Sequence, residues 1–369
     1  MSIDGILERA LNGERLTMDD AVRLYESDEI EKMGAAANEI KKRWHPEPVA
    51  TFNIGRNVNY TNVCDTFCRF CAFYRRPGSE EGYLLSDDQI LQKIKELQDV
   101  GGDEILMQGG TNPNLPFEYY TNLLKKIKNH FPDVTMHSFT PAEVYKMMEV
   151  SGLSLREVLT ALHEAGLDSL PGGGAEILTE KTRKRISRLK CTADQWIDCM
   201  KMAKEVGMHG TATMVIGFGE SNEERAEHLW RIREAQDESN CFLAFISWTF
   251  QQDYTSMKGE RITPEGYLRN VAISRLFLDN IPNFQSSWVT AGPETGKRSL
   301  SYGCNDFGST MMEENVVSSA GTTHKVNINR ILRLIREAGY TPAQRNTKYH
   351  TLRVFEGEEN SEKDFVMQN

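Results

Sequence analysis

Hydrophobic and polar positions along the chain follow two different rhythms, which meet near residue 50. In the first part, Ile3, Leu7 and Ala10 recur at helical spacing, and a second apolar stripe starts at Ala21. Apolar residues three and four positions apart lie on one face of a helix. Residues 1–50 are therefore predicted to form a cap of two helices.

From residue 51 onwards, short β-prone runs alternate with longer amphipathic segments. Strands are predicted at Thr51–Asn59, Asp103–Gln108, Asp133–Phe139, Asp168–Leu170, Gly210–Ile216, Phe242–Phe250, Asn283–Val289 and Ser299–Gly303. Helices are predicted at Ser86–Val100, Phe117–Asn129, Pro141–Val150, Leu155–Ala165, Asp194–Val206, Asn222–Glu238, Thr263–Leu278 and Asn327–Ala338. Eight strand–helix units favour a parallel sheet closed into a (β/α)8 barrel, or a partly open relative of one.

The predicted architecture is an α/β protein in three parts. A TIM-type barrel over residues 51–320 follows the N-terminal helical cap of residues 1–50. Residues 321–369 form a C-terminal extension, in which a helix and a polar tail pack on the barrel. Active sites of such barrels lie at the carboxyl ends of the strands, so the chemistry is expected on the loops that follow them.

Composition and charge exclude several classes of partner. The chain has 369 residues, of which 39% are hydrophobic and 26% charged, and its formal net charge is −10. This balance argues against nucleic acid as a partner, because nucleic acid selects basic faces. No apolar run approaches the ~20 residues that span a bilayer, and the N-terminus lacks a signal-peptide pattern. With seven cysteines, an odd number, the chain is predicted to be cytoplasmic, with reduced thiols and no membrane insertion.

Three cysteines lie close together in the segment YTNVCDTFCRFCAFYR, directly after the first predicted strand. Cys64, Cys68 and Cys71 have the spacing C-x3-C-x2-C. Cysteine thiolates are the usual ligands of iron–sulfur clusters, and three ligands would leave one iron of a 4Fe–4S cluster open. A zinc site with a distant fourth ligand is the alternative, and it would make the protein a non-catalytic metal binder. The polar residues between the cysteines argue against simple core thiols.

The pattern C-x3-C-x-aromatic-C resembles the cluster loop of the radical S-adenosylmethionine (SAM) superfamily. The resemblance implies that Cys64, Cys68 and Cys71 bind a 4Fe–4S cluster, whose open iron binds SAM. Electron transfer from the reduced cluster would then give a 5′-deoxyadenosyl radical. The implied cofactor-binding residues are Phe70, Phe73, Tyr74, Gly109, Gly110, Glu176, Val215, Ile216 and Gly217. Thr111 stands where the superfamily usually has an acidic residue after the glycine pair.

Longer segments are similar to one subgroup of that superfamily, which acts on quinone and deazaflavin precursors. They include NVNYTNVCDTFCRFCAFYR, GLDSLPGGGAEIL and NDFGSTMMEENVV, and together they span residues 57–317. The resemblance implies a cyclisation of dehypoxanthine futalosine in menaquinone biosynthesis. The radical would abstract the C4′ hydrogen of the ribose, and the sugar radical would add to the benzoate ring of the same substrate. Aminofutalosine synthase and the FO synthase components are the alternatives within the subgroup.

This reaction requires a proton acceptor, partners for the ribose hydroxyls and donors for the benzoate. The predicted catalytic residues are His137, Glu176 and Asp306. The predicted substrate-binding residues are Ser138, Gln285, Ser287, Asn305, Glu313, Glu314 and Asn315. A structural role is the alternative for His137, and helix capping for Glu176. A low-potential electron donor such as flavodoxin or ferredoxin is the implied protein partner.

Overall fold

The computed structural model describes residues 2–364 and opens with a helical cap. Its helices are α1 (Asp4–Leu11), α2 (Met18–Glu26) and α3 (Ile30–Trp44). α2 starts at a capping box in which Thr17 and Asp20 exchange hydrogen bonds. The prediction of two helices was wrong, because α3 buries a weak apolar stripe rich in small residues, with Ala36 and Ala37 on its inner face.

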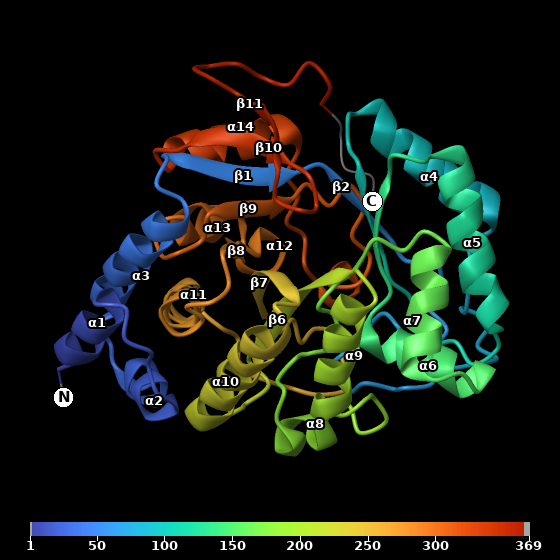
Figure 1. Cartoon of the computed structure of the whole chain (residues 1–369), viewed down its shortest axis with the longest axis horizontal. Helices are drawn as coiled ribbons and strands as arrows, with labels where there is room; N and C mark the ends of the chain where they lie inside the picture. The colour runs from blue at the N-terminus through green and yellow to red at the C-terminus, as the bar shows by residue number, and fades with distance from the viewer. Residues whose placement is uncertain (1, 365–369) are drawn as a thin grey trace.

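The α/β barrel predicted from the sequence is confirmed. Its strands are β1 (Val49–Asn53), β2 (Gly55–Val58), β3 (Glu104–Met107), β4 (Thr135–Ser138), β5 (Ser169–Leu170), β6 (His209–Ile216), β7 (Phe242–Thr249), β8 (Asn283–Gln285) and β9 (Asp306–Ser309). They form one sheet in the order β1-β9-β8-β7-β6-β5-β4-β3-β2, and each neighbouring pair is parallel. Only Ile54 separates β1 from β2, so the first predicted strand contributes to both ends of this order and curls the sheet into a barrel (Figure 1).

Helices surround the sheet on its outer side (Figure 1). They are α4 (Asp87–Asp99), α5 (Phe117–His130), α6 (Pro141–Ser151), α7 (Leu155–Glu164), α8 (Glu180–Ile186), α9 (Ala193–Glu205), α10 (Asn222–Ser239), α11 (Pro264–Phe277), α12 (Trp288–Ala291) and α13 (Pro293–Ser299). Capping boxes start α4, α6, α7, α9 and α10, and the ends of these helices agree closely with the ranges predicted from the amphipathic pattern.

The last two predicted strands are placed differently in the structure. β8 ends at Gln285, and Ser287 occupies the N-cap position of the short helix α12 instead of continuing the strand. The prediction of a strand at Ser299–Gly303 was wrong. Helix α13 ends there in a tight turn, and β9 starts only at Asp306. Asp306 therefore lies in a buried strand, and not on a loop after it.

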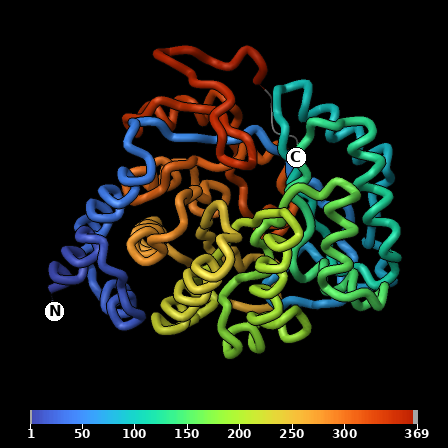
Figure 2. Tube along the Cα trace, in the orientation of Figure 1, coloured from blue at the N-terminus to red at the C-terminus, as the bar shows by residue number. Residues whose placement is uncertain are grey.

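The C-terminal part of the chain adds two strands that were not predicted. After η1 (Ser318–Ala320) and α14 (Ile328–Glu337) come β10 (Thr341–Arg345) and β11 (Thr351–Val354). β10 pairs in parallel with β1, from Val49 opposite Thr341 to Phe52 opposite Gln344. Figure 2 shows this late segment, in red, running beside the early blue strand.

The domain boundaries predicted after residues 50 and 320 stay predictions. Residues 365–369, at the end of the predicted C-terminal segment, lie outside the part of the chain that the structure describes. Within residues 2–364, no helix is long and apolar enough to cross a lipid bilayer.

Candidate active site

The three-cysteine loop follows β2 at the carboxyl end of the barrel. Cys64 and Cys68 are buried, and Cys71 is partly exposed. The loop folds back on itself, because the N–H of Cys64 donates to the carbonyl of Arg75 at 2.9 Å. Phe67, between the first two cysteines, has a left-handed backbone with φ of 52°. The loop thus presents all three thiols from one tight turn of chain.

The charges of the three thiols and of Lys190 influence one another's titration. Burial raises the pKa of Cys68 to about 12, and the neighbouring Cys71 and Cys64 add to this rise, while Lys190 opposes it. Burial likewise raises the pKa of the Cys71 thiol, with Cys64 contributing and Lys190 again opposing. Thiols that repel one another as anions need a cationic partner to bind as thiolates, and an iron–sulfur cluster supplies positive charge.

The donor set fits a cluster with several irons. In the described part of the chain, no three His, Cys, Asp or Glu side chains are arranged about a single metal ion. In a 4Fe–4S cluster each thiolate binds a different iron, so the sulfurs need not converge on one point. Lys190, which interacts electrostatically with Cys68, would offset part of the negative charge that the thiolates bring to the cationic iron–sulfur core.

Glu176 has the geometry of a ligand-binding carboxylate. Its backbone is left-handed, with φ of 41°, and follows the triple glycine that ends at Gly174. One carboxylate oxygen accepts a hydrogen bond from Lys190 at 3.0 Å. The other oxygen lies 3.7 Å from Arg183 and is buried without a hydrogen-bond partner. Buried carboxylate oxygens are normally hydrogen-bonded, so this oxygen fits a hydroxyl donor of a bound nucleoside.

Gly109 and Gly110 pack the cluster loop against the end of β3. A Cβ on Gly110 would lie 2.1 Å from the carbonyl oxygen of Val63 and 2.7 Å from the Cβ of Cys64. The N–H of Gly109 donates to Glu143, so it is engaged within the protein. Thr111 contacts the Cys64 sulfur through its hydroxyl at 3.1 Å. The glycine pair thus permits a close approach that any side chain would prevent.

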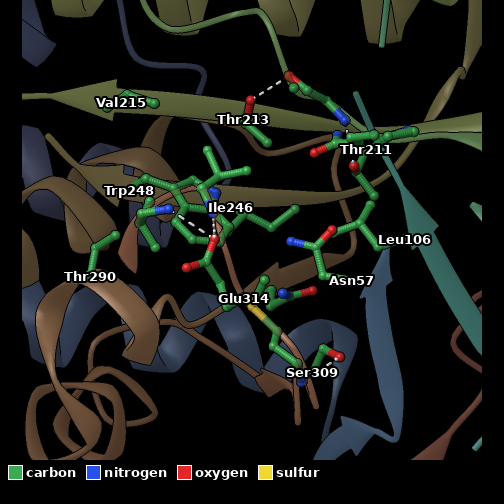
Figure 3. A pocket seen from close by; sticks show the side chains of 18 of the residues that line it. Asn57, Leu106, Thr211, Thr213, Val215, Ile246, Trp248, Thr290, Ser309 and Glu314 are labelled. Carbon is green, nitrogen blue, oxygen red and sulfur yellow. Dashed lines mark hydrogen bonds between the residues drawn. The ribbon is translucent and has the colours of Figure 1, made fainter. Parts of the chain in front are cut away.

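A cavity of about 270 Å³ fills the barrel interior beneath the cluster loop. Figure 3 shows side chains from several strands around it, including Asn57 and Leu106 on one side and Ile246 and Trp248 on another. Seven predicted site residues line this main cavity: Phe70, Cys71, His137, Glu176, Val215, Gln285 and Glu314. The cavity extends from Cys71 of the cluster loop to Gln285 and Arg345 at the ends of β8 and β10, so a ligand inside it would lie beside the cluster loop.

His137 is held in one orientation at the wall of the main cavity. Its Nδ1 lies 2.7 Å from the hydroxyl of Ser169, and the ring is buried. Burial lowers the pKa of His137, which keeps the imidazole neutral at physiological pH. A neutral imidazole can accept a proton.

Two other predicted residues at the cavity already have protein partners. Gln285 Oε1 accepts hydrogen bonds from Arg345 at 3.3 Å and Tyr349 at 3.4 Å. The carboxylate of Glu314 accepts hydrogen bonds from the N–H groups of Val316, Val317 and Ser318. Burial raises the pKa of Glu314, while these N–H groups oppose the rise.

The remaining predicted residues lie outside the main cavity. Phe73, Glu313 and Asn315 line a second hollow near the cluster loop, where Glu313 is paired with Arg56 and Lys93. The ring of Tyr74 packs on Phe67 with 5.9 Å between centroids. The others are packed in the protein: Ser138, Ile216, Gly217, Ser287, Asn305 and Asp306.

Asp306 holds the barrel floor together. Its carboxylate pairs with Arg345 at 2.5 Å and accepts the hydroxyl of Thr51, also at 2.5 Å. Its side chain is fully buried, and its partners come from β10 and β1. These contacts give the buried Asp306 a structural role. Its predicted catalytic role stays a prediction.

Several cavity residues were not predicted. Asn57, Thr213 and Trp248 line the cavity from β2, β6 and β7, and period-two alternation along those strands could have identified them. Arg345 and Tyr349 line it from the C-terminal extension. No local sequence pattern predicts that a C-terminal extension enters a barrel, so nothing in the sequence indicated that these two residues line the cavity.

Comparisons with known proteins agree with this geometry. Residues 58–231 match the family model described as the radical SAM superfamily, and residues 239–357 match that of the CofH/MqnC C-terminal region. Among solved structures, methylornithine synthase (PylB) is similar with a TM-score of 0.71 and 17% identity, covering 93% of this chain and 97% of that one. That likeness supports the fold.

Curated relatives give a narrower assignment. Cyclic dehypoxanthine futalosine synthase of Halalkalibacterium halodurans is 72% identical over 100% of both chains. The synthase of the same name from Streptomyces coelicolor is 44% identical, over 97% of this chain and 91% of that one. Aminodeoxyfutalosine synthase of Thermus thermophilus is 37% identical, over 95% and 96%. The chain therefore belongs to the radical SAM superfamily, within the family of cyclic dehypoxanthine futalosine synthases.

Proposed function

We propose that the chain cyclises dehypoxanthine futalosine by abstracting the C4′ hydrogen of its ribose and joining that carbon to the benzoate ring. The observation that carries the proposal is the 72% identity over the full length of both chains to a cyclic dehypoxanthine futalosine synthase. The product would contain two hydrogens fewer than the substrate. One would leave in 5′-deoxyadenosine, and the other as a proton together with one electron.

As a member of this superfamily, the chain uses a 4Fe–4S cluster and SAM. Cys64, Cys68 and Cys71 would hold the cluster, and the bound pair supplies a 5′-deoxyadenosyl radical. Glu176 would accept a hydrogen bond from a hydroxyl of SAM with its unpartnered oxygen. Lys190 fixes the other oxygen of Glu176, so the carboxylate is oriented before the cofactor binds.

The walls of the main cavity would hold the substrate ring next to its ribose. Leu106, Ile246 and Trp248 provide apolar surface there, while Asn57 offers a polar side chain. The Oδ1 of Asn57 is buried without a hydrogen-bond partner, which suits a hydroxyl of the sugar. Holding the two reacting carbons in contact supplies an entropic advantage of roughly 7–11 kcal/mol in the best cases.

His137 would accept the proton that leaves the ring after the carbon–carbon bond has formed. Its Nδ1 is engaged with Ser169, which leaves Nε2 for this task if Nδ1 carries the proton. The walls of the cavity would limit the access of bulk water and so protect the radical from side reactions.

The cellular setting follows from the chemistry. A low-potential carrier such as flavodoxin or ferredoxin would supply the electron that each SAM cleavage consumes. The free thiols and the need for a reduced cluster support a cytoplasmic location.

The experiment is anaerobic turnover of reconstituted protein with dehypoxanthine futalosine, SAM and a reductant. The expected products are 5′-deoxyadenosine and a compound lighter than the substrate by two hydrogens, both identified by mass spectrometry. Consumption of a chorismate-derived enol ether instead would assign the chain to the aminofutalosine synthase reaction.

A further inference from the structure

Exposed cations gather beside the cluster loop, on a chain whose formal net charge is −10. Helix α8 and the turn after it carry four of them: Lys181, Lys184, Arg185 and Arg188. Arg69, between Cys68 and Cys71 in the chain, is also exposed. The N–H of Arg69 donates to the carbonyl of Ile186 at 2.9 Å, so the end of α8 adjoins the cluster loop.

These cations are hardly neutralised by the protein itself. Among residues 2–364, no carboxylate forms an ion pair with four of them: Arg69, Lys184, Arg185 and Arg188. Arg69 and Arg185 instead donate hydrogen bonds to backbone carbonyls. Lys181 reaches Glu224 only at 3.8 Å, and its side chain is 83% exposed. On the neighbouring helices α7, α9 and α10, by contrast, Arg156, Lys201 and Arg231 each pair with a carboxylate. The surface by the cluster loop therefore keeps a positive potential that attracts anionic partners.

Two large apolar side chains are exposed within the same surface. Leu189 is 59% exposed, and Tyr254 is 86% exposed. The loop that carries Tyr254 is tied to the cluster loop, because the N–H and the hydroxyl of Ser256 donate to the carbonyl of Arg69 at 3.0 and 2.9 Å. Exposed apolar groups beside charged ones are typical of protein–protein interfaces, and a small anion would not need them.

We propose that this basic face, made of Arg69, Lys181, Lys184, Arg185, Arg188 and Leu189, binds a small acidic protein that delivers one low-potential electron to the cluster. The proposal rests on the proposed function, because each SAM cleavage consumes one electron. The carrier loses one electron and the oxidised cluster gains it, and no covalent bond changes in this step. Electron transfer slows steeply with distance, and this face adjoins the loop of Cys68 and Cys71.

The test compares two routes of reduction in one variant. Lys181→Glu, Lys184→Glu and Arg188→Glu are combined, because none of these residues contacts the thiols or lines the main cavity. The probe is flavodoxin, whose affinity for the cluster-loaded protein is measured by isothermal titration calorimetry. We expect the affinity and the flavodoxin-driven rate of deoxyadenosine formation to fall about tenfold or more. The dithionite-driven rate should stay unchanged, since dithionite needs no docking surface.

A matched control reverses three exposed cations on helices other than α7–α10: Arg23→Glu on α2, Lys95→Glu on α4 and Lys125→Glu on α5. It changes the net charge equally, and it should leave both the flavodoxin affinity and both rates unchanged. In the unaltered protein, raising the ionic strength from about 0.05 M to about 0.3 M should weaken flavodoxin binding, as screening predicts.

Three outcomes would overturn the docking face. They are an unchanged flavodoxin affinity in the first variant, an equal loss in the control, and an equal loss of the dithionite-driven rate. Phosphatidylserine vesicles are tested in parallel, and vesicle binding that the first variant abolishes while flavodoxin binding persists would assign the face to membranes. If neither reductant yields deoxyadenosine in the unaltered protein, the proposed function fails, whereas the calorimetry still reports on docking.

Discussion

The three thiols of the cluster loop differ from the other cysteines in their surroundings. Cys64, Cys68 and Cys71 lie on an irregular loop with polar neighbours, whereas Cys199 is fully buried on the inner face of α9. Buried thiols on helices act as small hydrophobic groups. This contrast gives a matched pair of substitutions for testing the cluster ligands.

Replacing Cys68 by alanine should abolish cluster binding, because two thiolates cannot hold the cube in place of three. Iron analysis after anaerobic reconstitution should fall well below the about four irons of a 4Fe–4S cluster, and deoxyadenosine should be undetectable. Cys199→Ala should lose some stability and retain its iron. Full iron content in Cys68→Ala would refute the ligand assignment.

His137→Gln should separate radical formation from product formation. Loss of a positioned proton acceptor slows a reaction by about 10²–10⁴-fold, so cyclised product should fall by that factor while deoxyadenosine still forms. The pKa of His137 is lowered by burial, so the neutral base persists as pH falls through 6.5. The product-forming rate should therefore stay level down to that pH, and a decline that begins above it would contradict the role.

His228 should make the fold sensitive to acid. Burial lowers its pKa to about 3, and its Nδ1 accepts the N–H of Leu178. Below pH 6.5 the unfolded chain binds a proton that the folded chain does not, so stability falls as pH decreases. Between pH 7 and pH 5, protonation of His228 in the unfolded chain lowers the free energy of unfolding by about 2 kcal/mol.

The variant His228→Asn keeps an acceptor and removes the titration. Urea unfolding measures the free energy of unfolding at pH 7 and at pH 5. The decrease between these two pH values should be smaller by about 2 kcal/mol in the variant than in the unaltered protein. An identical difference in both proteins would mean that the pKa of His228 is not lowered by folding, because the contributions of all other groups cancel in this comparison.

At the scale of elements, the junction of β3 with the cluster loop depends on one missing side chain. Gly110→Ala would place a methyl group 2.1 Å from the carbonyl oxygen of Val63 and 2.7 Å from the Cβ of Cys64. Both are parts of the cluster loop, so the loop must shift. We expect a loss of about 1–3 kcal/mol in stability and reduced iron retention.

Gly5→Ala is the control for this substitution. Gly5 lies in α1, where a methyl group on its Cα would meet nothing within 4 Å, and alanine favours a helix more than glycine does. It should be neutral or slightly stabilising in thermal unfolding, with unchanged iron content. Equal iron retention in both variants would show that the loop tolerates a side chain at residue 110.

Elements with strong local signals were predictable, and those defined by packing were not. The amphipathic pattern located α4, α7 and α10 from the sequence, and each of these helices begins at a serine capping box. The strand predicted at Ser299–Gly303 failed because its apolar residues belong to the turn after α13, while β9 is a short segment of Asp306–Ser309 with little β signal. Short central strands derive their stability from neighbours, which sequence periodicity does not record.

The residues of the candidate site likewise fall into those with a local sequence signal and those without one. The cysteine triplet is a local pattern and was found from spacing alone. Glu176 and His137 were found because they follow or end strands, where barrel chemistry lies. Arg345 and Tyr349 enter the cavity from a C-terminal extension some 290 residues beyond the first strand, and only the folded chain brings them there.

At the scale of the whole molecule, the C-terminal extension completes the barrel floor. β10 lies beside β1, and Arg345 at its end reaches Asp306 on β9 and Gln285 on β8. The guanidinium also lies over the ring of Tyr349, 3.8 Å from its centre. One side chain thus links the last part of the chain to the floor of the main cavity.

Removing that link should destabilise the protein and open the cavity. Arg345→Met would leave Asp306 as an uncompensated charge in a fully buried position, which costs about 3–5 kcal/mol. Urea unfolding followed by circular dichroism measures this loss. Adding Asp306→Asn to Arg345→Met removes the charge and should restore part of the stability. If the single variant loses less than about 1 kcal/mol, the pair is no stronger than a surface ion pair and the extension is held by β10 alone.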